Sequence, residues 1–183
     1  MAESVKLTDL IEKLKLRNIT ESIDVSRISI TTPEINRPGL QLAGYYNHFM
    51  TNRVQIIGNA EQDYLQNLSH DQRLACMEKF LSQASPKGVK IPCLILCRGH
   101  MPTKSMYDVA LEYGVPILIS EDSTSNVMVN TIVYLNAQLA PMCAIHAVLV
   151  DVYGEGVLIT GESGIGKSEI ALELVKRGHR LIS

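Results

Sequence analysis

Two hydrophobic patterns alternate along the first 140 residues. Apolar residues recur every three or four positions in stretches that predict amphipathic helices near residues 7–16, 60–68, 70–83, 103–113 and 124–139. Between them lie stretches that predict strands at residues 53–57, 91–97 and 115–119, and the run 91–97 is continuously apolar, as is typical of a strand buried on both faces of a sheet. Helices that alternate with buried strands predict a small α/β domain with a mostly parallel sheet.

Polar residues at the ends of these stretches predict helix caps. Ser69 and Gln72 form the S-x-x-Q pattern of a capping box, and Thr103 stands where an N-cap is needed before the next helix. Asp9 and Glu12 resemble a capping box for the first helix, although Ser or Thr is the usual cap.

The chain changes character after Pro141, which we take as a domain boundary between residues 1–140 and 141–183. Residues 145–152 and 156–160 are rich in strand-forming side chains and flank a hairpin-type turn at residues 153–156. Helical spacing resumes after Lys167 and ends at Gly178, and a short strand is expected after it.

Composition excludes several classes of protein. The chain has 183 residues, 46% of them hydrophobic and 20% charged, and a formal net charge of −2. These values argue against disorder and give no overall basic bias towards nucleic acid. No apolar run is long enough to span a membrane, and the first residues lack the apolar core of a secretory signal. We expect a soluble, cytoplasmic protein with no nucleic-acid or membrane partner.

A phosphate-binding loop is the strongest chemical signal in the sequence. The pattern G-x-x-x-x-G-K-[ST] is matched between an apolar strand and a helix by Gly161, Glu162, Ser163, Gly164, Ile165, Gly166, Lys167 and Ser168. Glycines let backbone N–H groups turn towards an anion at the helix N-terminus. We expect the loop to bind ATP, Lys167 to reach the β- and γ-phosphates, and the Ser168 hydroxyl to coordinate Mg²⁺. The alternative is a glycine-rich turn with an exposed lysine.

His146 is a further candidate, because of the expected hairpin register. Symmetric pairing about Gly154-Glu155 would place Tyr153 opposite Gly156, and residue 146 opposite residue 163 in the loop. An imidazole there could contact the γ-phosphate or relay a proton. A strand histidine satisfied by core hydrogen bonds is the alternative that register alone leaves open.

Two other groups of residues point more weakly to chemistry. Cys93 and Cys97 would share one face of a strand but lie about 13 Å apart, too far for one metal ion or a disulfide, so we interpret them as buried small hydrophobic residues. A basic cluster at the last helix suits either the helix dipole or a phosphate-bearing partner: Lys176, Arg177, His179 and Arg180.

The stretch from Ile145 to Ile182, IHAVLVDVYGEGVLITGESGIGKSEIALELVKRGHRLI, resembles the kinase core of HPr kinase/phosphorylase. The first domain is similar to the smaller domain of that family at Arg37–Tyr46 (RPGLQLAGYY), Arg53–Gly58 (RVQIIG) and Ile91–Gly99 (IPCLILCRG). The resemblance covers nearly the whole chain.

This resemblance implies an ATP- and Mg²⁺-dependent enzyme that phosphorylates a serine of HPr, the phosphocarrier protein of the sugar phosphotransferase system. It also implies the reverse phosphorolysis, which links phosphate and pyrophosphate to the reaction, a role in carbon catabolite repression, and assembly as a hexamer. His146 matches the family's active-site histidine, Lys167 its phosphate-loop lysine and Ser168 its Mg²⁺-binding hydroxyl.

The sequence departs from the family pattern at three places. Ala147 and Glu162 replace a common glycine and a common aspartate, and neither change removes a needed group. The aspartate pair that follows the L-I-x stretch in the family, one of which acts as a base, lies beyond Ser183. We therefore expect a truncated P-loop kinase domain after the α/β domain. The alternatives are a catalytically incomplete fragment that serves only as a binding or oligomerisation module, and a small-molecule kinase that shares the loop.

Overall fold

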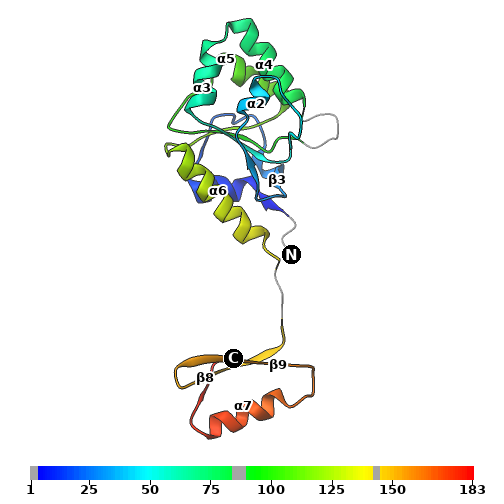
Figure 1. Cartoon of the computed structure of the whole chain (residues 1–183), viewed down its shortest axis with the longest axis vertical. Helices are drawn as coiled ribbons and strands as arrows, with labels where there is room; N and C mark the ends of the chain where they lie inside the picture. Colours follow the sequence, from blue (N-terminus) through cyan, green and yellow to red (C-terminus); the bar gives the residue numbers. More distant parts are fainter. Residues whose placement is uncertain (1–3, 84–89, 142–144) are drawn as a thin grey trace. The chain divides into compact units, whose positions relative to one another are not determined.

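The computed structural model describes residues 4–83, 90–141 and 145–183 (Figure 1). The chain divides into two compact units, residues 1–141 and 142–183, and each has its own sheet. Among the described residues, no helix is both long and apolar enough to cross a membrane.

A five-stranded sheet forms the centre of the first unit. Its strand order is β2-β7-β6-β5-β4, with bounds Arg17–Asn18, Ile117–Ile119, Leu94–Leu96, Val54–Ile57 and Ile35–Asn36. The pairs β4–β5, β5–β6 and β6–β7 are parallel, and only the edge strand β2 is antiparallel. The predicted α/β class with a mainly parallel sheet is therefore confirmed. Strand β6 is shorter than the predicted run 91–97, which contains Pro92, a residue that cannot donate a ladder hydrogen bond.

In the described part of this unit, six α-helices accompany the sheet: α1 (Leu7–Leu14), α2 (Gly39–Leu42), α3 (Asn59–Asn67), α4 (His70–Ser82), α5 (Lys104–Tyr113) and α6 (Thr124–Leu139). A short 3₁₀ helix spans Val25–Arg27, and β1 (Val5–Lys6) pairs with β3 (Ser29–Ile30) in a two-stranded antiparallel sheet. The ends of α3 to α6 lie within a residue of the stretches predicted from helical spacing.

Two of the three predicted caps are confirmed. Ser69 accepts a hydrogen bond from the backbone N–H of Gln72 in a capping box, and Thr103 accepts one from Met106 N–H. The capping box predicted at Asp9 is wrong, because α1 already begins at Leu7 and its N-cap residue, Lys6, makes no side-chain bond. Leu7 is fully buried, so packing of its side chain accompanies the earlier start.

Successive sheet residues point into two separate hydrophobic layers. Ile57, Leu96 and Ile119 pack with buried residues of α2 to α5 on one face. Ile56, Ile95 and Leu118 pack with α1 and α6 on the other face. In Figure 1, α6 lies on the opposite side of the sheet from α3, α4 and α5. Cys93 and Cys97 belong to this second layer and are fully buried, as predicted for small hydrophobic residues.

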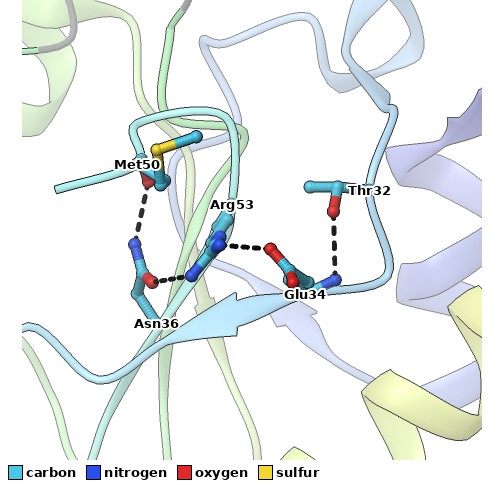
Figure 2. Close-up of polar contacts among 5 residues, drawn as sticks. All are labelled: Thr32, Glu34, Asn36, Met50 and Arg53. Atoms are coloured by element: carbon cyan, nitrogen blue, oxygen red, sulfur yellow. Dashed lines mark hydrogen bonds and ion pairs between the residues drawn. The ribbon is translucent and has the colours of Figure 1, made fainter. Parts of the chain in front are cut away.

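A polar network ties β4 to the start of β5 (Figure 2). The Arg53 guanidinium pairs with the Glu34 carboxylate and donates to Asn36 Oδ1 at 3.2 Å. The Asn36 amide in turn donates to the carbonyl of Met50 at 2.8 Å. Because Glu34 is mostly exposed, this ion pair lies at the rim of the unit.

The second unit is a three-stranded antiparallel sheet with one helix packed on it. Its strand order is β10-β8-β9, with bounds Arg180–Leu181, Ala147–Val152 and Glu155–Thr160, and the helix α7 spans Lys167–Lys176. Val150 and Ala171 are the buried apolar residues of this small unit.

The observed hairpin register corrects the predicted one. Val152 pairs with Glu155, so the turn consists of Tyr153 and Gly154 rather than Gly154 and Glu155. Both turn residues have positive φ, 54° and 88°, which is the type I′ geometry that matches the twist of the strands. Asp151 Oδ1 accepts a hydrogen bond from Gly154 N–H at 2.7 Å and supports the turn.

Candidate functional site

The phosphate loop lies between the end of β9 and the start of α7. Gly166 is the N-cap of α7, with φ 97°, and it has no side chain that could accept a hydrogen bond from the first amides of the helix. The N–H groups at a helix start lack partners within the helix and form a positive dipole end. This helix end therefore keeps its donors available for an anion.

Two glycines give the loop its inward curve. Gly164 and Gly166 have φ of 84° and 97°, in the left-handed region that other residues rarely adopt. A Cβ atom on Gly161 would also lie 3.0 Å from Cγ2 of Ile165. These positions therefore need glycine for reasons of backbone shape and space.

Lys167 is the first residue of α7, and its side chain folds back across the loop. The Nζ atom donates to the carbonyl oxygens of Gly161 and Glu162, each at 2.7 Å. These contacts hold the ammonium group at the loop, where it could form charge-assisted hydrogen bonds with the phosphates of a nucleotide. Ser168, the next residue, is exposed at the same helix end.

The loop lines a cavity of about 830 Å³. Its lining includes His146, Lys167, Ser168 and every other residue of the predicted loop except Ile165. The structure thus brings His146 and the loop together, as expected. However, the predicted pairing of residue 146 with residue 163 is wrong, because the ladder ends with Ala147 opposite Thr160. The roles of these residues in binding and catalysis stay predictions.

Three further residues line the cavity and were not singled out from the sequence: Ile145, Thr160 and Glu169. Glu169 is the most informative, because it is the acidic residue of the first turn of α7. Its position directly after the G-K-S triplet was the sequence feature that could have indicated its place at the site.

The donor set at this site suits Mg²⁺ only together with a phosphate ligand. In residues 4–83, 90–141 and 145–183, no group of three or more His, Cys, Asp or Glu side chains could hold a metal ion. Mg²⁺ usually keeps several waters and binds through few protein ligands plus substrate phosphates. The Ser168 hydroxyl beside an anion-binding loop is compatible with that mode of binding.

The structure gives local contacts for the weaker candidates, and the choice between the helix dipole and a phosphate-bearing partner for the basic cluster stays open. Burial raises the pKa of the Cys93 and Cys97 thiols, which disfavours their reactive thiolate forms. In the basic cluster, Arg177 pairs with Glu173 on the same helix. The His179 ring packs edge-on against Tyr153, with 4.8 Å between ring centroids.

Comparison with known proteins identifies the family. The family profile described as "HPr Serine kinase N terminus" matches residues 5–135, and that of the "HPr Serine kinase C-terminal domain" matches residues 137–183. The HPr kinase/phosphorylase of Lachnoclostridium phytofermentans is 51% identical over 98% of this chain and 56% of that protein. The enzyme of Latilactobacillus sakei is 43% identical over the whole chain and 56% of its own length.

The chain therefore spans a little more than half the length of these curated relatives. Among solved structures, the CBS and DRTGG domains of the regulatory region of Clostridium perfringens pyrophosphatase align with a TM-score of 0.43 and 13% identity. That alignment covers 71% of this chain and 49% of the other, and is too weak to support an argument. The two family profiles together match nearly every residue, and the chain belongs to the HPr serine kinase family.

Proposed function

We propose that this chain carries the ATP-binding part of a Mg²⁺-dependent protein-serine kinase/phosphorylase that acts on HPr, the phosphocarrier of the sugar phosphotransferase system, in carbon catabolite regulation. The observation that carries the proposal is the cavity that His146, Lys167 and the loop line together. In this proposal, residues 1–140 form the N-terminal domain and residues 141–183 begin the kinase domain.

The loop backbone and the N-terminus of α7 bind and orient the phosphates. Their N–H groups need no reorganisation to meet negative charge that develops during phosphoryl transfer. Lys167 Nζ has three N–H groups and donates two of them to loop carbonyls, so the third can donate to a phosphate oxygen. Ser168 would hold Mg²⁺, which when bound neutralises charge on the β- and γ-phosphates.

His146 provides the titratable nitrogen of the cavity. An imidazole can donate a hydrogen bond to a phosphate oxygen or hold a proton on one ring nitrogen while the other is bonded. We assign it to the γ-phosphate end of the nucleotide because it lines the same cavity as the loop.

The remaining parts of the proposal come from the family. The relatives are named HPr kinase/phosphorylase, and we therefore propose HPr as the protein substrate. We propose phosphorolysis, in which phosphate is consumed and pyrophosphate is released, as the reverse reaction. A cytoplasmic homo-oligomer, a hexamer as in the family, completes the proposal.

ATP binding by the Lys167→Ala variant tests the core of the proposal. Loss of a charge-assisted bond to phosphate should weaken ATP binding at least roughly 10-fold, as measured by equilibrium dialysis with Mg²⁺. Lys176→Ala is the matched control, because Lys176 stands at the other end of α7 and does not line the cavity. Equal ATP affinity of the Lys167→Ala variant and the wild type would refute the assignment.

Phosphate transfer tests the substrate separately. The full-length gene product should label a serine of purified HPr from γ-labelled ATP, and Lys167→Ala should abolish labelling while its circular dichroism spectrum is unchanged. ATP binding without any transfer to HPr would leave the nucleotide site standing and remove HPr as the substrate.

A further inference from the structure

The charges that line the phosphate cavity do not favour a polyanion as strongly as the loop motif alone suggests. Lys167 is the only lysine or arginine among the described lining residues, whereas Glu162 and Glu169 each contribute a carboxylate. With histidine counted as neutral, the side chains of the cavity carry one net negative charge, from +1 and −2. A metal-free nucleotide therefore meets repulsion from the side chains as well as attraction from the backbone.

Neither carboxylate is neutralised by a neighbour. Within the part of the chain that the structure describes, neither the Glu162 nor the Glu169 side chain forms an ion pair or a hydrogen bond, whereas Glu173, one turn further along α7, pairs with Arg177. Glu169 Oε2 lies 3.7 Å from the point that a Cβ atom on Gly166 would occupy. The carboxylate thus lies beside the loop, at the helix end that offers its N–H groups.

The chain also offers Mg²⁺ little without a nucleotide. Ser168 is a neutral ligand, and no cluster of three metal-binding side chains exists among the described residues. Mg²⁺ bound to the phosphates cancels part of their negative charge, and hydrogen bonds that nearby carboxylates accept from metal-bound waters offset the repulsion that remains. The two glutamates therefore disfavour the free nucleotide but not its magnesium complex.

We propose that Glu162 and Glu169 are specificity-determining residues that make the cavity select the magnesium complex of ATP over metal-free ATP. This inference rests on the proposed function, because it concerns the same site. It assigns the metal dependence of binding to two side chains of this chain, in addition to the direct contact between Ser168 and Mg²⁺. Binding of Mg²⁺ and of ATP is then linked, and each raises the affinity for the other by the same factor.

Equilibrium binding of ATP at pH 8, with EDTA or with saturating Mg²⁺, tests this proposal without any measurement of activity. Glu162→Gln and Glu169→Gln should each tighten binding of metal-free ATP roughly 3- to 10-fold, the effect of one nearby charge in a partly solvated site. Binding of the magnesium complex should stay the same or weaken, so the ratio of the two dissociation constants falls. Glu173→Gln, also on α7 but outside the cavity lining, should leave the ratio unchanged.

The use of two variants separates an effect on nucleotide binding from an effect on folding. Glu169 also interacts favourably with the N-terminal dipole of α7, so its substitution lowers helix stability slightly, whereas Glu162 lies in the loop before the helix. Unchanged affinity for metal-free ATP in both variants, or an equal change in both forms of the nucleotide, would overturn the proposal. If the wild type bound neither form, the proposed function itself would fall. If it bound both forms and the variants kept its ratio, only this inference would fail.

Discussion

The ion pair between Arg37 and Glu61 allows a quantitative test of how the first unit is held together. The Glu61 side chain is 6% exposed, and both of its carboxylate oxygens accept from Arg37 at 2.9 Å. The same carboxylate accepts from Gly58 N–H at 2.9 Å, at the junction of β5 and α3. Arg37→Met keeps much of the aliphatic stem but leaves a buried carboxylate without its cation.

The expected cost follows from burial. Removal of one partner from a fully buried pair costs about 3–5 kcal/mol. The Arg37 side chain is 42% exposed and Gly58 N–H remains bonded, so we expect about 2 kcal/mol. At an m-value of about 2 kcal/mol/M, the urea midpoint followed by circular dichroism falls by about 1 M.

Arg53→Met is the matched control for this experiment. Its partner, Glu34, has a side chain that is 61% exposed, so the pair in Figure 2 should contribute less than about 1 kcal/mol. The double variant Arg37→Met/Glu61→Gln should lose less stability than the sum of its single variants, because the pair is coupled. A loss below about 0.5 kcal/mol in Arg37→Met, or one no larger than in Arg53→Met, would refute the role of burial.

Two further predictions concern packing and ionisation. Gly58→Ala should lower the free energy of unfolding by about 1–3 kcal/mol in urea titrations, because the new Cβ atom would lie 2.6 Å from Thr124 Oγ1. Gly156→Ala is the control and should cost less than about 1 kcal/mol, because its Cβ atom would have its nearest neighbour at 3.9 Å. Equal costs of the two substitutions would contradict the steric argument. Burial raises the pKa of the Cys93 thiol in the folded protein, whereas in the unfolded chain the thiol loses its proton near its ordinary pKa of about 8.5. The buried neutral thiol therefore contributes its full stability below that pH, and the free energy of unfolding falls by up to about 1.4 kcal/mol for each pH unit above it. Urea titrations at pH 8 and 9.5 should show a smaller loss for Cys93→Ala than for the wild type, and parallel losses would count against this account.

Much of the fold follows from short-range patterns. The buried runs around Ile95 and Leu118 predict central strands because a strand with both faces covered is apolar at nearly every position. The strand β5 follows this pattern less closely, because it contains the buried Gln55. The helices α3 to α6 were predicted because each has helical spacing and, for α4 and α5, a side-chain cap at its start.

The edge elements escaped prediction for a physical reason. Strands β1 to β4 are two residues long, too short for any periodic pattern, and their pairing depends on contacts distant in the sequence, such as Arg17 with Ile119. Likewise, the hairpin turn was misplaced by one residue because Tyr153 adopts a positive φ, which is uncommon for a bulky residue.

The candidate site was more predictable than its surroundings. The loop motif prescribes local backbone geometry, so Gly161 to Ser168 and the helix after them could be located from the sequence alone. The hairpin register also predicted that His146 lies beside the loop, although it paired the histidine with the wrong residue. The family resemblance added the expectation of an active-site role. Glu169 was overlooked because an acidic first-turn residue is common at any helix start.

Every described residue that lines the phosphate cavity comes from the single run 145–169. Closing a short stretch of chain costs little configurational entropy, and neighbouring segments meet quickly. Hairpin, loop and helix start can therefore assemble during folding or synthesis without waiting for partners from distant parts of the polypeptide.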